Sequence, residues 1–193
     1  GEGRGGVFFR TRIGPCDVIM TDGRFFRQKD SFLGSEQMKW LESQLLDCKG
    51  PFIILESSTM WSDYVSNGED SWGVYDRRGR EHVFDLIEKN RIGGVLLISG
   101  DRHGARGFRI PRPSGFDFYE FEPASLGGID WGPKAKVPNC PQQLFGHLGY
   151  AFGEFTLDAG VPDPTVDFRL IDEAGNVLYR ITLARSQLTP KGT

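Results

Sequence analysis

GVLLISGDRH, residues 94–103, is the stretch that decides the fold. Its apolar run predicts a strand over 94–98 that is buried on both faces, as in a parallel sheet. The small residues that follow allow a sharp turn, which leads to Asp101 and His103 at the carboxyl end of the strand. A carboxylate and an imidazole two residues apart predict two metal ligands. Such a mixed oxygen and nitrogen pair favours iron, manganese or zinc over calcium or magnesium, although carboxylates bind all of these ions.

The residues before this strand predict alternating strands and helices. Expected strands are 7–12, 17–21 and 52–55, and expected helices are 35–47, capped by Ser35, and 71–90. The polar stretch between the second helix and the strand before it is expected to be a loop at the carboxyl end of that strand. This order of elements predicts right-handed crossovers in a parallel or mixed sheet.

After His103 the helical periodicity ends and short strands are expected. They are 104–110, 116–122, 149–157, 165–171 and 176–183, the last two forming a hairpin, with a Gly- and Pro-rich connection over 123–147. The predicted fold class is therefore α/β (α+β), with a mixed sheet followed by a β-rich C-terminal part.

Composition excludes several classes of function. The 193 residues include 38% hydrophobic and 12% aromatic residues, enough for the core of one globular unit. A net charge of −3 with interspersed Lys and Arg gives no basic stripe for a nucleic-acid polymer. No apolar stretch predicts a membrane span or a signal peptide, and the compartment stays unknown. Cys16, Cys48 and Cys140 lack the spacing of a zinc site and are expected to be small apolar residues.

Several blocks of residues resemble one known family in both sequence and order. The blocks are VIMTDGRFFR (18–27), LGSEQMKWL (33–41), WGVYDRR (72–78), ISGDRH (98–103), and a C-terminal block from FGEF (152–155) to SQL (186–188). Over residues 10–188 the chain resembles the PhoD-like family, that is, alkaline phosphatase D and its relatives. The sequence departs from the family pattern at Gly23, where Thr is usual, and at Arg102 and Gly104, where apolar and aromatic residues are usual.

This resemblance implies an αββα sandwich that hydrolyses phosphate monoesters or diesters with iron and calcium as cofactors. The phosphate ester is the expected substrate partner. Residues 1–110 would be the α/β part that carries the Asp-x-Arg and Ser-Gly-Asp-x-His motifs, and residues 111–193 would close the sandwich.

The resemblance also assigns site residues. Asp101 and His103 are expected to be catalytic metal ligands, and the expected substrate-binding residues are Arg24, Arg27 and Arg102. Expected supporting residues are Asp22, Trp72, Tyr75 and Arg78. The residues alone leave other readings open: a turn joining Asp22 to Arg24, core packing of the aromatic pair, an Arg102 that points to solvent, and a solvated Asp101 loop. His147 is a further candidate ligand, whereas His82 is expected to face solvent or a neighbouring helix.

Motifs that such enzymes place in their first half are missing from this chain. The chain has none of these motifs, which are an early Asp motif, Gly-Asp-x-x-Asp and an Asn-His or Asp-His pair, and no Gly-Asp-x-x-Asp lies ahead of Asp22. We therefore expect an incomplete C-terminal half, which binds metal weakly, is inactive alone, and forms a dimer through the apolar surface left by the missing half.

A hypothesis from another class remains open. The β-rich half could be a non-catalytic module that recognises a partner or a polysaccharide, with Asp101 and His103 in structural roles. Exposed aromatic residues around Trp131 would favour it.

Overall fold

A computed structural model describes residues 5–65, 71–123, 125–127 and 135–191. Its main sheet has seven strands in the order β1-β2-β3-β4-β6-β5-β7. The strands are β1 (Phe9–Ile13), β2 (Cys16–Met20), β3 (Phe52–Glu56), β4 (Val95–Ile98), β5 (Ala105–Pro111), β6 (Asp117–Glu122) and β7 (Gln143–His147). β2, β3, β4 and β6 are parallel, and β1, β5 and β7 run antiparallel to their neighbours, so the sheet is mixed as predicted.

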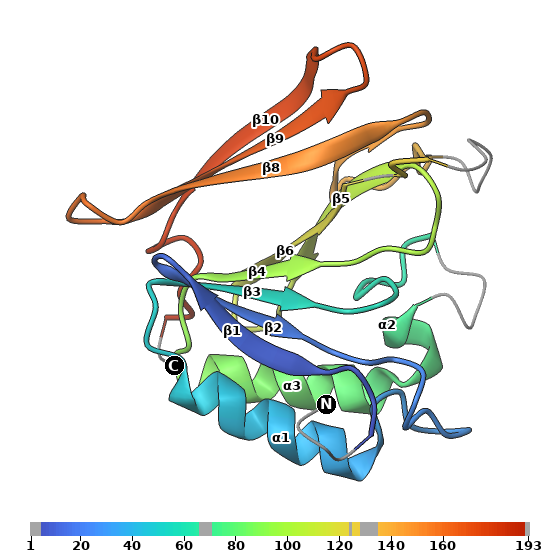
Figure 1. Cartoon of the computed structure of the whole chain (residues 1–193), viewed down its shortest axis with the longest axis vertical. Helices are drawn as coiled ribbons and strands as arrows, with labels where there is room; N and C mark the ends of the chain where they lie inside the picture. Colours follow the sequence, from blue (N-terminus) through green and yellow to red (C-terminus); the bar gives the residue numbers. More distant parts are fainter. Residues whose placement is uncertain (1–4, 66–70, 124, 128–134, 192–193) are drawn as a thin grey trace.

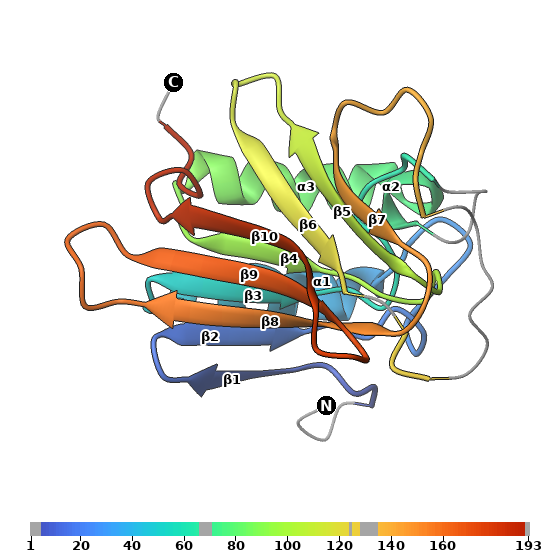
Figure 2. The same ribbon diagram turned by 90° about the horizontal axis from the view of Figure 1, so that it is seen from above.

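Three layers make up the molecule. Helices α1 (Gly34–Asp47), α2 (Trp72–Tyr75) and α3 (Arg77–Lys89) cover one face of the main sheet (Figure 1). A second sheet of β8 (Ala151–Asp158), β9 (Thr165–Asp172) and β10 (Val177–Ala184) lies over the other face, as Figure 2 shows. The fold class expected from the sequence is thus confirmed, as a β-rich partial sandwich with the helices on one side.

Two apolar cores separate these layers. Leu41, Leu55, Phe84 and Leu97 belong to the core between the helices and the main sheet. Phe52, Leu96, Phe121 and Phe168 belong to the core between the two sheets. Neighbouring residues of β4 therefore contribute to opposite cores, which is why its sequence is an unbroken apolar run.

The helical segment after residue 70 departs from the sequence prediction. One helix was expected over 71–90, but the chain breaks at Asp76 between α2 and α3. Asp76 Oδ1 accepts the N–H of Gly79 at 2.8 Å, and its Oδ2 accepts the N–H of Phe32 at 3.0 Å. Asp76 thus caps α3, because a short carboxylate competes for backbone N–H groups at a helix start. The expected start at Ser71 is correct, since Ser71 caps α2.

The start of α1 also differs from the prediction. Ser35 was expected to cap this helix, but α1 begins at Gly34, and its N-cap Leu33 makes no side-chain cap. The Oγ of Ser31 accepts the N–H of Gly34 instead, at 3.0 Å. Gly34 has a φ of 70°, a conformation in which glycine carries no steric penalty.

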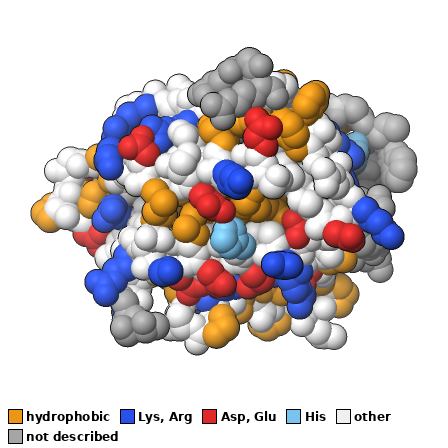
Figure 3. Space-filling view, turned by 90° about the horizontal axis from the view of Figure 1, so that it is seen from below, with side chains coloured by type: hydrophobic (Ala, Val, Ile, Leu, Met, Phe, Trp, Pro, Cys, Tyr) orange, Lys and Arg blue, Asp and Glu red, His pale blue; other side chains and the backbone are white. Residues whose placement is uncertain are grey.

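The helical face carries charges of both signs. On the helical face, Lys and Arg side chains are interspersed with Asp and Glu (Figure 3). The three cysteines are free thiols, of which Cys16 is buried and the other two are half-buried. Among the described residues, no helix has the length and hydropathy needed to cross a membrane.

Candidate functional site

The loop of residues 99–104 joins β4 to β5 and holds the backbone in unusual conformations. Asp101, His103 and Gly104 have φ values of 80°, 48° and 96°. Side chains rarely tolerate this left-handed region, and non-glycine residues held there are concentrated at functional sites. Asp101 and His103 are exposed, whereas Arg102 between them is buried. The loop therefore presents both the carboxylate and the imidazole to solvent.

Arg102 does not point to solvent, which was one of the two alternatives considered from the sequence. Its side chain is buried and Nη2 donates to the carbonyl of Val65 at 2.7 Å, while its N–H donates to Glu122 Oε1 at 2.8 Å. The side chain thus ties the 99–104 loop to the loop after β3. Its substrate-binding role remains a sequence prediction, and the contacts found are structural.

Asp22 lies at the same edge of the sheet, beyond the end of β2. Because β2, β3 and β4 are parallel, their carboxyl ends meet at one edge, with β3 between the other two (Figure 1). Asp22 is buried; its Oδ1 accepts the N–H groups of Arg24 and Phe25 at 2.8 and 3.0 Å, and its Oδ2 accepts that of Val7 at 2.9 Å. Burial alone would raise the pKa of Asp22, but these backbone donors lower it. Asp22 therefore shapes the turn that leaves Arg24 exposed.

Gly23 is explained by the packing around it. A Cβ at this position would lie 2.3 Å from Ser58 Oγ and 2.4 Å from Phe32 Cζ. Phe32 is fully buried, and its ring centroid lies 5.0 Å from that of Trp72 on α2. A Thr side chain at position 23 would not fit here, because the Phe32 ring and Ser58 Oγ occupy the space that it would need.

Glu56 is the last residue of β3, which lies between β2 and β4 and so between the turn at Asp22 and the 99–104 loop. Its Oε2 accepts the N–H of Thr21 at 3.2 Å. Burial raises the pKa of Glu56 to about 7, and the charge of Asp22 acts in the same direction. Glu56 was missed in the sequence, where the expected strand ended at residue 55.

This raised pKa predicts a pH-dependent stability. The folded chain holds the Glu56 proton more tightly than the unfolded chain, so the free energy of unfolding should fall as the pH rises from about 4.5 to 7. Glu56→Gln should remove about 2 kcal/mol of this fall, since one pKa unit corresponds to about 1.4 kcal/mol and partial exposure weakens the effect. Urea denaturation at several pH values measures it, with the exposed Glu173→Gln as the control. A Glu56→Gln profile parallel to that of the wild type would contradict the assignment.

A fully buried carboxylate lies beneath the loops. Glu120 Oε1 accepts the N–H of Trp61 and the hydroxyl of Ser99, both at 2.7 Å, and Oε2 accepts the N–H of Ser62 at 3.0 Å. Burial raises the pKa of Glu120. One side chain thus fixes the loop after β3 to the first residue of the 99–104 loop.

The supporting residues expected on α2 and α3 have separate surroundings. Trp72 is fully buried, with its ring centroid 4.7 Å from that of Trp61. Tyr75 donates its hydroxyl to the carbonyl of Gln28 at 2.5 Å, and the guanidinium of Arg27 lies 3.8 Å from the Tyr75 ring centroid. Arg78 is exposed at the start of α3. Tyr75 thus lies beside Arg27. Trp72 packs in the core, which was the alternative considered from the residues alone.

The other two histidines lie in different places. His82 Nε2 lies 2.7 Å from Glu42 Oε1, which joins α3 to α1 as expected for a helix neighbour. His147 ends β7 and pairs with Ala105, so its backbone adjoins the 99–104 loop. Its role as a ligand remains a prediction. Trp131, on which the binding-module hypothesis depends, lies outside the described residues.

Metal binding can be judged from the donors present. Asp101 and His103 supply an exposed oxygen and an exposed nitrogen on one fixed loop, which fits the periphery of a metal centre. Within the residues that the structure describes, no group of three or more His, Cys, Asp or Glu side chains could hold a metal ion. A centre with four or more protein donors would need further ligands.

Comparison with known proteins supports the resemblance. The family model described as PhoD-like phosphatase matches residues 4–158. The solved structure titled "Structure of PhoD" is similar with a TM-score of 0.73 and 16% sequence identity, over 97% of this chain. This chain spans 44% of the length of that structure. No curated protein matches the chain.

Proposed function

Because the chain belongs to the PhoD-like phosphatase family, we propose that its 99–104 loop forms part of a metal centre that hydrolyses phosphate monoesters or diesters. The observation that carries this proposal is the backbone of that loop, with Asp101 and His103 both exposed and both in the left-handed region. Strain of this kind, at the carboxyl end of a central parallel strand, is typical of a functional site.

The candidate site residues have different tasks in this proposal. Asp101 and His103 hold the metal, for which iron and calcium are proposed, with manganese or zinc as alternatives. A bound metal would activate water and neutralise charge on the phosphoryl oxygens. Exposed Arg24 would pair with the substrate phosphate, because a guanidinium fork matches phosphate oxygens. Arg27 and Arg102 have weaker support, since one lies on Tyr75 and the other is buried.

Two donors are too few for a complete centre. We infer that the remaining ligands come from a segment outside these 193 residues. Without that segment, apolar surface would drive the chain to form a dimer.

Metal analysis and a phosphatase assay test this proposal. The isolated chain should bind metal weakly and show no turnover of p-nitrophenyl or bis(p-nitrophenyl) phosphate, whereas the intact natural protein should require metal for turnover. Size-exclusion chromatography of the isolated chain should show a dimer. Robust metal-dependent turnover by a monomer of the 193 residues would contradict the inferred missing ligands, and turnover by the intact protein that survives chelation would contradict the metal centre itself.

A further inference from the structure

Arg106 on β5 is a fully buried arginine directly opposite Glu122 on β6. The two residues are paired in the antiparallel register, and Arg106 Nη1 lies 3.0 Å from Glu122 Oε2. Their side chains are 0% and 3% exposed, so the ion pair is removed from solvent. Replacing a buried ion pair by apolar residues is often neutral or stabilising, so stability alone does not account for this one.

Both partners also bind the backbone of the 99–104 loop. Arg106 Nη1 donates to the carbonyls of Arg102 and Gly104 at 3.2 and 3.1 Å, and Nη2 donates to the carbonyl of His103 at 3.2 Å. Glu122 Oε1 accepts the N–H of Arg102 at 2.8 Å. One ion pair therefore satisfies four backbone groups of three consecutive residues.

These contacts coincide with the left-handed part of the loop. A free loop would relax toward ordinary conformations, because left-handed backbone persists only where the surroundings determine it. We propose that Arg106 and Glu122 are positioning residues, which hold the loop backbone so that Asp101 and His103 face the same centre. The functional consequence rests on the proposed metal centre, whereas the backbone role can be measured without it.

Hydrogen exchange of the full 193-residue chain tests the backbone role. In Arg106→Met, the amide of Arg102 should exchange at least about tenfold faster relative to the β4 amides than in the wild type. Arg112→Met is the matched control, because the Arg112 side chain is only 8% exposed, pairs with Glu81 and Glu88, and contacts α3 rather than the loop. This control should leave the ratio of exchange rates unchanged, even if it lowers global stability.

Glu122→Gln provides a second variant if Arg106→Met does not fold. Glu122 accepts the Arg102 N–H at Oε1 and the Arg106 guanidinium at Oε2, so a glutamine, which has an NH2 group in place of one oxygen, keeps at most one of these contacts in the same geometry. In this variant the exchange rate of the Arg102 amide relative to the β4 amides should also rise. A ratio equal to that of the wild type in the folded variants would overturn the proposal.

Titration with Mn²⁺ separates this inference from the proposed function. If the positioning role and the metal centre are both correct, the Mn²⁺ concentration needed to broaden the Asp101 and His103 resonances should rise about tenfold in Arg106→Met or Glu122→Gln. The same concentration should stay constant in Arg112→Met. An unchanged concentration in the loop variants would overturn the positioning role. A wild type without any broadening at this loop would reject the metal centre, and the exchange ratio would still decide the backbone role.

Discussion

Asp101→Asn in the intact natural protein should lower kcat for hydrolysis of bis(p-nitrophenyl) phosphate by about three orders of magnitude. The substitution removes the negative charge that would hold the metal in the proposed centre and keeps nearly the same shape. It should not disturb the loop, because asparagine tolerates the left-handed backbone that residue 101 adopts, with a φ of 80°. His103→Ala should cause a loss of similar size.

Steady-state kinetics with metal analysis checks this result. Asp158→Asn, a change of the same kind at the end of β8, should retain wild-type kcat. Near-normal turnover of Asp101→Asn or His103→Ala with unchanged metal content would remove that residue from the set of ligands.

Glu120→Ala should lower the free energy of unfolding by about 4 kcal/mol. The change leaves the N–H groups of Trp61 and Ser62 and the hydroxyl of Ser99 without their acceptor in a buried site. Each unsatisfied buried group costs about 1–3 kcal/mol, and the cavity left by the side chain adds to this. Glu120→Gln should cost less, because its single oxygen still accepts from some of these donors.

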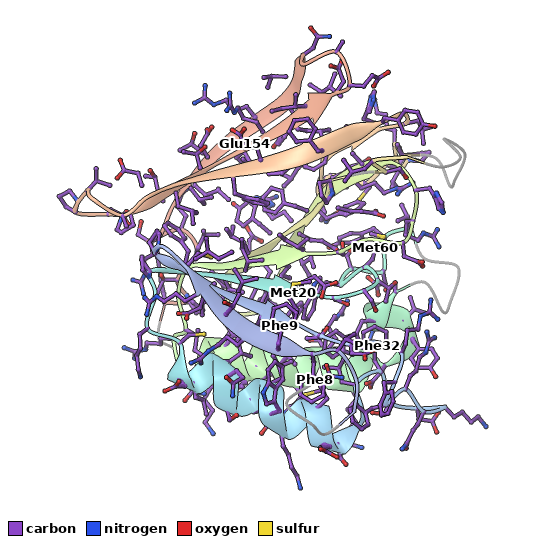
Figure 4. The ribbon with its side chains drawn as sticks, viewed as in Figure 1. Phe8, Phe9, Met20, Phe32, Met60 and Glu154 are labelled. Atoms are coloured by element: carbon purple, nitrogen blue, oxygen red, sulfur yellow. The ribbon has the colours of Figure 1, made fainter. Side chains whose placement is uncertain are left out.

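Urea denaturation measures the effect. Glu154→Ala is the control, since Glu154 lies on β8 in the outer sheet (Figure 4) and pairs with Arg169 near the surface. Such a pair contributes less than about 1 kcal/mol. If Glu120→Ala destabilised the chain no more than Glu154→Ala, Glu120 would not hold the two loops together.

The sequence predicted the parts of the fold in which local pattern and burial agree. The apolar run of β4 is buried on both faces, and the hairpin of β9 and β10 alternates as expected, with Asp172 accepting N–H groups of the turn at Ala174 and Asn176. The helix break at Asp76 was missed because its second contact, the N–H of Phe32, lies 44 residues away.

The candidate site was predicted only in its exposed part. Asp101 and His103 stand out beside an apolar strand, but Arg106, Glu120 and Glu122 resemble ordinary polar positions of half-exposed strands. Their burial depends on the pairing of β5 with β6, which no local pattern gives. One signal was present: Glu120 and Glu122 share the alternation of buried Phe118, and two acids on an apolar face of a strand indicate buried partners.

A metal bound to the 99–104 loop through Asp101 and His103 should be detectable in solution. The most direct measurement is a titration of the isotope-labelled chain with Mn²⁺, observed by amide and imidazole resonances. Paramagnetic broadening should begin at Asp101, Arg102 and His103, and it should be absent from these residues in Asp101→Asn. Broadening that begins at other acidic groups, such as Asp30 and Asp85, and leaves residues 101–103 unaffected would contradict it.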